Sequence, residues 1–172
     1  MKNQFIQGAF IMTLSTLATS SIHGETVDIK MDKGSLTIEM ADLTTPYQLS
    51  YEMPQDCLAE LEVKEVANSI ELSHRGDECP KGALVKLLIR STASLDVQLT
   101  TGVITLNHMR ALLKEVKSLD ASVRAGTVIT STPKIKTSPC CTFAGAEGSF
   151  KSDSNEKGVS YKLRLGAGLI QL

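Results

Sequence analysis

Thiol chemistry is the first possibility that the sequence raises, because the 172-residue chain carries four cysteines. Cys57 and Cys79 lie at either end of a compact segment, which favours a disulfide bond between them, although four cysteines allow three complete pairings. The adjacent Cys140 and Cys141 would close a strained ring if they were joined to each other. They are either free, and then open to redox chemistry, or each reaches back to an earlier cysteine. A purely structural role is the ordinary interpretation of all four.

The sequence offers little else for catalysis or metal binding. His74 and His108 are the histidines beyond residue 24, and neither has a second ligand at metal-binding spacing. No Gly-x-Ser-x-Gly turn is present, and no helix follows the run Gly166-Ala167-Gly168 to donate N–H groups to a phosphate. We therefore expect no catalytic residues, no metal site and no cofactor, and a protein that is not an enzyme.

Arg75, Gly76 and Asp77 form an Arg-Gly-Asp tripeptide two residues before Cys79. On a loop tethered by a cysteine, the tripeptide would present a cation and a carboxylate outward, which is the pair that integrin-type receptors bind. The same three residues are also an ordinary turn composition. The tripeptide is a candidate recognition loop, with a plain turn as the alternative.

Residues 1–24 have the features of a secretory signal peptide. Lys2 supplies the positive start, an apolar stretch runs from Phe5 to Ala18, and small residues follow it. The stretch is too short and too interrupted for a transmembrane helix, and no later segment approaches about twenty consecutive apolar residues. An uncleaved N-terminal anchor is the alternative. We expect an exported protein, in the periplasm or at the cell surface, with a single mature domain over residues 25–172.

A strand-forming pattern recurs five times along the mature chain. In each unit apolar and polar residues alternate on both sides of a glycine or an asparagine. Alternation at a period of two places the apolar side chains on one face of a strand, and glycine supplies the positive φ that a tight corner needs. The sequence therefore predicts strand–corner–strand units, each with one face to bury. The corners are Gly34, Asn68, Gly102, Gly126 and Gly168.

Such units must stack, because one unit cannot bury its apolar face alone. The predicted fold class is all-β, a β-solenoid-like stack of strand–glycine–strand repeats. A β-sandwich is the alternative, since its hairpins also alternate and turn on glycines. The inward aliphatic positions should form the core, among them Val97, Leu99, Ile104, Leu163, Leu165 and Ile170.

Two stretches depart from the repeats. Met109, Leu112, Leu113 and Val116 fall at helical spacing after Asn107, a candidate N-cap. One short helix is therefore expected near residues 107–118, with a further strand as the alternative. The proline-, glycine- and serine-rich stretch 133–155 is expected to be a long surface loop and, with the stretch 54–80, to carry any recognition.

The charges nearly balance overall but are unevenly divided. A formal net charge of -1 argues against a nucleic-acid binder, which normally has a basic excess. Residues 25–79 contain 4 basic and 13 acidic residues, whereas residues 80–172 contain 13 basic and 6 acidic ones. Such a bipolar molecule could associate head to tail or turn its basic end toward an anionic surface. Compensation between neighbouring units is the alternative.

The repeated units, with the closing run 163–170, resemble the putative adhesin family of bacterial exported proteins over most of residues 27–172. The resemblance implies an exported, β-solenoid-like domain of unknown biochemical function. Asn68 in place of glycine and the segment from Cys57 to Cys79 depart from the family pattern. We expect an adhesin-like envelope or surface module that binds an unknown partner and has no catalytic activity. A periplasmic protein with a cysteine-based redox or metal-handling role is the alternative.

Overall fold

The computed structural model describes residues 10–14, 25–53, 57, 61–75, 82–140, 144–152 and 158–172. These residues form eleven strands and one short helix, so the all-β class predicted from the sequence is confirmed. The helix, α1 (Met109–Glu115), lies between β7 and β8. The strands are β1 (Phe10–Leu14), β2 (Thr26–Ala41), β3 (Tyr47–Met53), β4 (Leu61–Val66), β5 (Ser69–His74), β6 (Ala83–Arg90), β7 (Ser94–Leu106), β8 (Val116–Ile129), β9 (Lys136–Cys140), β10 (Gly145–Lys151) and β11 (Val159–Gln171).

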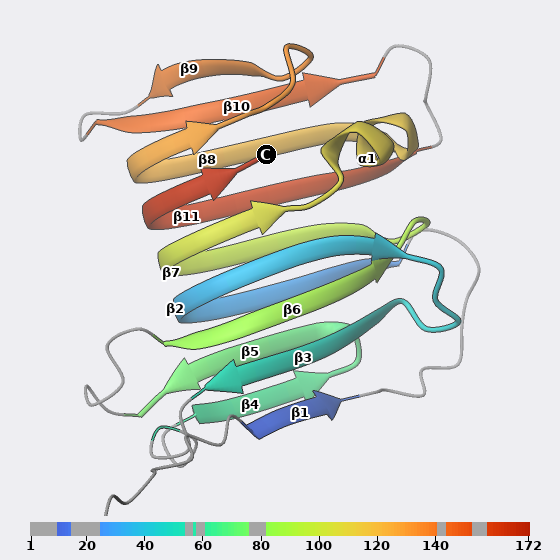
Figure 1. Ribbon diagram of the computed structural model, residues 1–172, viewed down its shortest axis with the longest axis vertical. Coiled ribbons are helices and arrows are strands. Elements are labelled where there is room, and N and C mark those ends of the chain that lie inside the picture. Colours follow the sequence, from blue (N-terminus) through green and yellow to red (C-terminus); the bar gives the residue numbers. More distant parts are fainter. Residues whose placement is uncertain are drawn as a thin grey trace, which may run out of the picture.

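All of these strands hydrogen-bond into one open, mixed sheet (Figure 1). Its order is β1-β3-β6-β2-β7-β11-β8-β10-β9, with β5 also paired to β2, and β4 to β5. The long strands β2, β7, β11 and β8 pair in parallel, whereas the strands toward the two ends pair antiparallel. One continuous sheet is not the pair of separate sheets that a β-sandwich requires.

Each long strand bends back on itself at a glycine. The register places Gly34 beside Gly102, Gly102 beside Gly168, and Gly168 beside Gly126. Their φ angles lie between 136° and 148°. A Cβ on Gly102 would lie 1.8 Å from the Gly34 carbonyl oxygen, so no other residue fits this corner. We call these four residues the glycine column.

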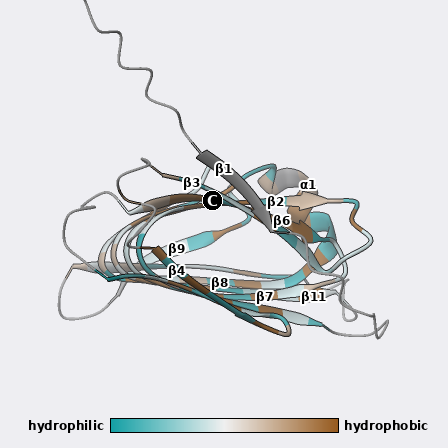
Figure 2. Ribbon diagram, turned by 90° about the horizontal axis from the view of Figure 1, so that it is seen from below, coloured by the Kyte–Doolittle hydropathy of each residue, from teal (hydrophilic) through white to brown (hydrophobic). Residues whose placement is uncertain are grey.

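Bending at the glycine column folds the sheet into two layers that face each other across the core (Figure 2). The front layer contains the halves of the long strands after the glycine, together with β6, β3 and β1. The back layer contains the halves before the glycine, together with β5, β4, β10 and β9. The predicted inward positions are confirmed, because all six are buried: Val97, Leu99, Ile104, Leu163, Leu165 and Ile170.

The second predicted unit needs a correction, because Asn68 does not bend a long strand. With Ala67 it forms the two-residue turn of the antiparallel β4–β5 hairpin, and the positive φ of that turn, 52°, belongs to Ala67. β5 then pairs with the first half of β2, and β6 pairs with the second half. The strand that neighbours β2 is thus split at the level of Gly34. A regular β-solenoid through all five units is therefore not confirmed.

Helix α1 covers the side of the stack opposite the glycine column (Figure 1). Its residues Met109, Leu112 and Leu113 are buried in the core. The predicted helix is confirmed but its predicted cap is wrong, because His108, with a φ of 56°, is the N-cap residue. The Asn107 side chain instead donates a hydrogen bond from Nδ2 to Oε1 of Glu39 at 2.7 Å. Among the described residues, no helix is long and apolar enough to cross a membrane.

The two stretches expected to be recognition loops contain strands. The stretch 133–155 holds the β9–β10 hairpin, whose β10 pairs with the back half of β8. Pro139 is tolerated there because β9 pairs on one side only, and an outer strand does not need the missing N–H. The stretch 54–80 likewise contains β4 and β5. The expectation of a long surface loop over 133–155 is therefore wrong, whereas β4 and β5 are the two strands of the predicted unit around Asn68.

Replacing the central glycine of the column should damage the whole stack. We expect Gly102→Val to lower the free energy of unfolding by more than about 1 kcal/mol, because its Cβ overlaps the Gly34 backbone and valine resists a positive φ. Thr101→Val, which places the same valine one residue earlier at an exposed position that already holds a β-branched residue, is the control and should change little. Urea denaturation measures both, and a Gly102→Val variant as stable as the parent would contradict the glycine column.

Candidate functional site

The Arg-Gly-Asp candidate begins where β5 ends. The Arg75 side chain is 72% exposed, and its Nη2 and Nε atoms each lie 3.2 Å from Oε2 of Glu62 on β4. The hydrogen bond from Arg75, followed by the positive charges of Arg75 and Lys64, holds the pKa of Glu62 below its usual value. Gly76 and Asp77 lie outside the described residues. Recognition by the tripeptide stays a prediction, although its arginine is already engaged by a carboxylate of the same chain.

The cysteine predictions fall mostly outside the described part of the chain. Cys79 and Cys141 are not among the described residues, and Cys140 is described only as the last residue of β9. Cys57 is 9% exposed and forms a small apolar cluster with Met53, against which Leu61 packs. The predicted disulfide bond and the redox alternative both stay predictions.

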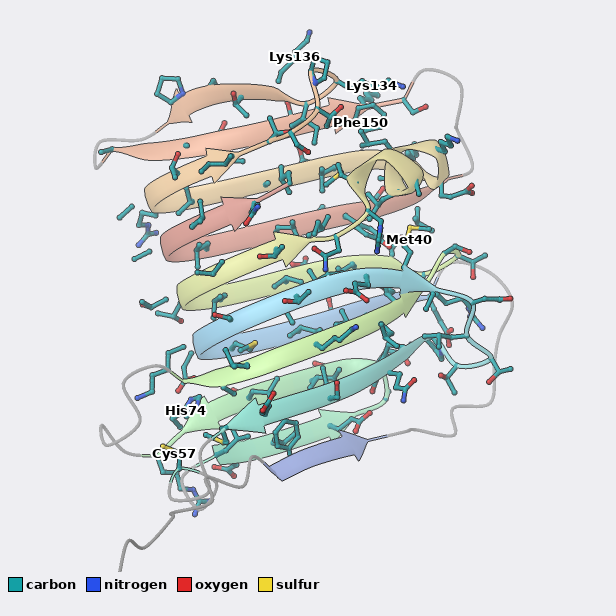
Figure 3. The ribbon with its side chains drawn as sticks, viewed as in Figure 1. Met40, Cys57, His74, Lys134, Lys136 and Phe150 are labelled. Carbon is teal, nitrogen blue, oxygen red and sulfur yellow. The ribbon has the colours of Figure 1, made fainter. Side chains whose placement is uncertain are left out.

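The structure brings His74 together with Asp32, two residues that lie far apart in the sequence. The His74 backbone N–H donates to Oδ2 of Asp32 at 2.7 Å, and the ring nitrogen Nδ1 lies 2.6 Å from Oδ1. The backbone N–H of Lys33 also donates to Oδ1 at 2.6 Å. The imidazole is fully buried at the end of β5, whereas the carboxylate is 37% exposed (Figure 3). The pair joins β5 to β2 just before the corner at Gly34.

Asp32 is held in its ionised form by these contacts. Partial burial raises the pKa of the carboxyl, but the hydrogen bonds from the His74 backbone, the His74 ring and the Lys33 backbone outweigh it, so the pKa lies below its usual value. A carboxylate in this position fixes the orientation of an imidazole. His108 lies elsewhere, next to α1, and among the described residues no three His, Cys, Asp or Glu side chains gather to hold a metal ion. The Asp32–His74 pair is a structural clamp on the corner.

The outer surfaces of the two layers differ sharply in charge, although the same four long strands form both. Along the back layer, the outward positions of these strands are mostly charged, and we call this surface the charged face. Along the front layer, the outward positions of these strands are uncharged except for Glu39 near the end of β2, and we call the uncharged part of this surface the uncharged face. The charged face comprises Asp28, Lys30, Asp96, Gln98, Asp120, Ser122, Lys162 and Arg164, and the uncharged face comprises Ser35, Thr37, Val103, Thr105, Thr127, Ile129, Leu169 and Gln171.

Opposite charges on the charged face meet within the molecule. Arg164 on β11 places Nη2 2.7 Å from Oδ2 of Asp96 on β7. The register sets Lys162 directly beside Asp96 on one side and beside Asp120 on the other. Neighbouring strands therefore compensate each other within residues 80–172, whereas the ion pairs Lys86–Glu39 and Arg90–Glu25 join the basic part of the chain to the acidic part.

The uncharged face is an even surface of hydroxyl, amide and aliphatic groups. The register lines up Thr37, Thr105 and Gln171 across β2, β7 and β11, with Ile129 of β8 beside Gln171 and 53% exposed. Toward β6 a shallow hollow of about 400 Å³ follows, lined by Thr37, Glu39, Ser50, Tyr51, Glu52, Leu84, Val85 and Lys86.

The charges that border this hollow are also paired. Lys86 on β6 places Nζ 2.9 Å from Oε2 of Glu39. The hydrogen bonds from Lys86 and then from Asn107 hold the pKa of Glu39 below its usual value. The charges at the β6 side of the uncharged face, Glu39 and Lys86, thus neutralise each other.

Sequence reasoning missed this contrast between the faces, although its signal was present. The outward residues before the corner glycines include many charges, such as Asp28 and Lys30, and those after them are uncharged apart from Glu39, as in Ser35 and Thr37. The difference in charge becomes visible only when the residues before each corner glycine are compared with those after it. The division of charge between residues 25–79 and 80–172 does not reveal it.

The chain has a remote likeness to several solved structures. No protein-family profile matches it, and no curated protein resembles it in sequence. It is similar to a solved structure of a putative cell adhesion protein from Clostridium sporogenes, with a TM-score of 0.47 and 9% identity over 95% of this chain and 98% of that chain. It is also similar to a putative adhesin from Bacteroides fragilis (TM-score 0.40, 13% identity, 95% of this chain and 57% of that chain). A putative adhesin from Parabacteroides distasonis has a TM-score of 0.35 and 13% identity over 73% of this chain and 50% of that chain.

The clamp between Asp32 and His74 should make stability depend on pH in acid. Because the folded pKa of Asp32 lies below the unfolded value of about 3.9, its carboxylate stabilises the fold fully above that value, and the contribution is lost as the pH falls through the folded pKa. We expect Asp32→Asn to cost about 1 kcal/mol at pH 7, since the group is partly exposed, and less at pH 3.

Urea denaturation of parent and variant between pH 3 and pH 7 measures this difference. Asp28→Asn removes an exposed carboxylate from the same strand and is the matched control, which should change stability little at any pH. A loss for Asp32→Asn that stays constant down to pH 3 would contradict the clamp.

Proposed function

We propose that the protein is an exported, adhesin-like binding module of the cell envelope or surface, without catalytic activity, and that the uncharged face meets its partner. The observation that carries the proposal is the difference between the two faces of the same four strands. A protein that needed only solubility would gain from charges on both faces, yet along the long strands the front face has a single charge, Glu39, at its border.

The energetics of association favour the uncharged face over the charged one. Burying the charged face would remove paired side chains such as Arg164 and Asp96 from water, which costs more than their mutual attraction returns. Burying Thr105, Leu169 and Ile129 removes hydroxyl and aliphatic groups at a much smaller cost. The face therefore suits a partner that is itself broad and uncharged.

Two features of the sequence support the proposed location. Residues 1–24 have the positive start, apolar stretch and small-residue end of a secretory signal. The strand–glycine–strand units resemble those of the putative adhesin family of exported proteins, and the front halves of these units form the uncharged face. Export and partner binding are thus parts of one proposal.

A charge placed on the uncharged face should weaken attachment to the envelope. We expect Thr105→Glu to reduce at least tenfold the fraction of protein that sediments with isolated envelopes of the producing cell. Gln98→Glu places the same charge on the other face of the same strand and is the matched control, which should sediment like the parent.

Salt provides an independent measurement of the same contact. Since no charge of the uncharged face takes part, sedimentation should persist between about 0.1 M and 1 M salt, where exposed ion pairs are screened. Release by salt, or equal release by the two variants, would contradict the assignment of this face.

Location can be measured on intact cells. We expect a protease or membrane-impermeant label added to intact cells to reach a surface-displayed protein, with a lysed sample as the control. Protection until the envelope is broken indicates the periplasm and a partner inside the envelope. Recovery of the protein from the cytoplasm, with residues 1–24 retained, would contradict export.

A further inference from the structure

The sheet is open, and its free edges differ in how they are protected against pairing with another strand. Unpaired N–H and C=O groups on an edge strand attract further strands, and proteins usually block them with charges, prolines or very short edge strands. In the back layer the edges are β4 and β9, and in the front layer they are the last residues of β8 and, beyond β3, the strand β1.

Three of these edges carry such protection. β4 presents Glu62, Lys64 and Glu65. β9 contains Pro139 and Lys136, and Lys136 lies at the outer limit of the sheet with Lys134 close by (Figure 3). In the front layer the edge of β8 consists of only the three residues after Gly126, as far as Ile129, that pair with β11. An edge this short gives a further strand too few hydrogen bonds for stable pairing.

β3 has none of these devices and is covered instead by β1. The strand of sequence Tyr-Gln-Leu-Ser-Tyr-Glu-Met has no lysine and no proline, and it carries a single charge at Glu52. β1 pairs with it antiparallel, from Phe10 opposite Met53 to Leu14 opposite Leu49. β1 lies inside residues 1–24, the segment that the sequence predicts to be a signal peptide. Removal of that segment would leave β3 as an unprotected edge.

The hydrogen bonds along β3 show which of its groups would be exposed. The Arg90 N–H donates to the Pro46 carbonyl, which sets the alternation between β3 and β6. Accordingly, the main-chain groups of Gln48 and Ser50 point to β6, and those of Leu49 and Tyr51 point to the edge that β1 occupies. The mature edge therefore offers a regular row of donors and acceptors in antiparallel spacing.

We propose that, in the processed protein, the β3 edge pairs with β3 of a second copy, antiparallel across a two-fold axis, and joins the front layers of two molecules into one sheet. This inference rests on the proposed export, because cleavage is what uncovers the edge. It adds an assembly step that the proposed function does not require.

A second copy fits this edge for two reasons. β1 shows that the edge accepts an antiparallel strand, and a two-fold axis perpendicular to the sheet relates two identical edge strands antiparallel. Buried and outward residues also alternate along β3. In such a pairing the core-facing side chains of the two copies therefore lie on the same face of the joined sheet, namely Tyr47, Leu49, Tyr51 and Met53. Because the contact consumes the unprotected edge of each molecule, assembly stops at a dimer.

The described core is supplied by the elements from β2 onward, with buried residues from Val27 to Leu172. The described part of β1 pairs with β3 and with no other strand. The chain from Glu25 onward is the predicted mature domain, and it is therefore the form to compare with the full chain.

The test compares the oligomeric state of the full chain with that of the chain beginning at Glu25, by light scattering after size-exclusion chromatography. We expect the full chain, with β1 in place, to be a monomer and the shorter chain to be a dimer. A shorter chain that stays monomeric up to about 100 µM, well above ordinary dimer dissociation constants, would overturn the proposal.

Variants of β3 show whether a dimer uses this edge. The double variant Gln48→Glu, Ser50→Glu gives three outward glutamates with Glu52, so every two-fold register sets like charges opposite each other. We expect its dimer dissociation constant to rise at least tenfold. Within the monomer, the new glutamate at position 50 lies opposite Lys86, so the fold should remain as stable as the parent by thermal denaturation.

The matched control is the double variant Gln98→Glu, Ser122→Glu. It adds the same charge to outward positions on either side of Arg164 in the back layer and should dimerise like the parent. A dimer that survives the β3 variant would place the contact elsewhere and overturn the proposal. The mass of the protein recovered after export separately reports cleavage, so a failure of the proposed export is distinguished from a failure of the edge pairing.

Discussion

The fold depends on the contact between backbones at the glycine column. At this corner successive chains lie so close that a Cβ on Gly126 would sit 1.9 Å from the Gly168 carbonyl oxygen. The contact allows four strands to bend in register, and bending in register is what brings two halves of one sheet face to face over a shared core. Without it, the alternating strands would bury their apolar faces only by finding another sheet.

The parts of the structure that follow from local sequence were predictable. Alternation at a period of two identifies inward residues such as Val97 and Leu163 because a strand imposes that period whatever its neighbours are. The glycines at 34, 102, 126 and 168 were visible as corners because the pattern reads as a strand on both sides of each. Helical spacing likewise revealed α1, since its buried residues recur within one element.

The remaining features depend on which strands become neighbours in the sheet. The alternation of residues within one segment does not specify its neighbours. Asn68 resembles a corner, yet its unit closes into a hairpin because β5 and β6 share the two halves of β2 as partners. The clamp between Asp32 and His74 arises only from that pairing. Pro139 predicts a loop in isolation, but it is compatible with a strand once β9 is the outermost one.

The two faces also follow from the corner, since each long strand contributes one half to each layer. A single strand can thus place mainly charged residues on one layer and mainly neutral residues on the other. The Glu39–Lys86 pair limits the neutral region on the β6 side, where the shallow hollow begins. Recognition by surfaces of regular strands is more rigid than recognition by loops, because every side chain is held by its ladder.

The position of β11 has a consequence for the order of folding. This strand comes after all of its neighbours in the chain, yet it lies between β7 and β8 and pairs in parallel with both. The middle of the sheet therefore stays incomplete until the last strand has been added. Closure of the core depends on contacts between segments far apart in the chain, a property that slows folding.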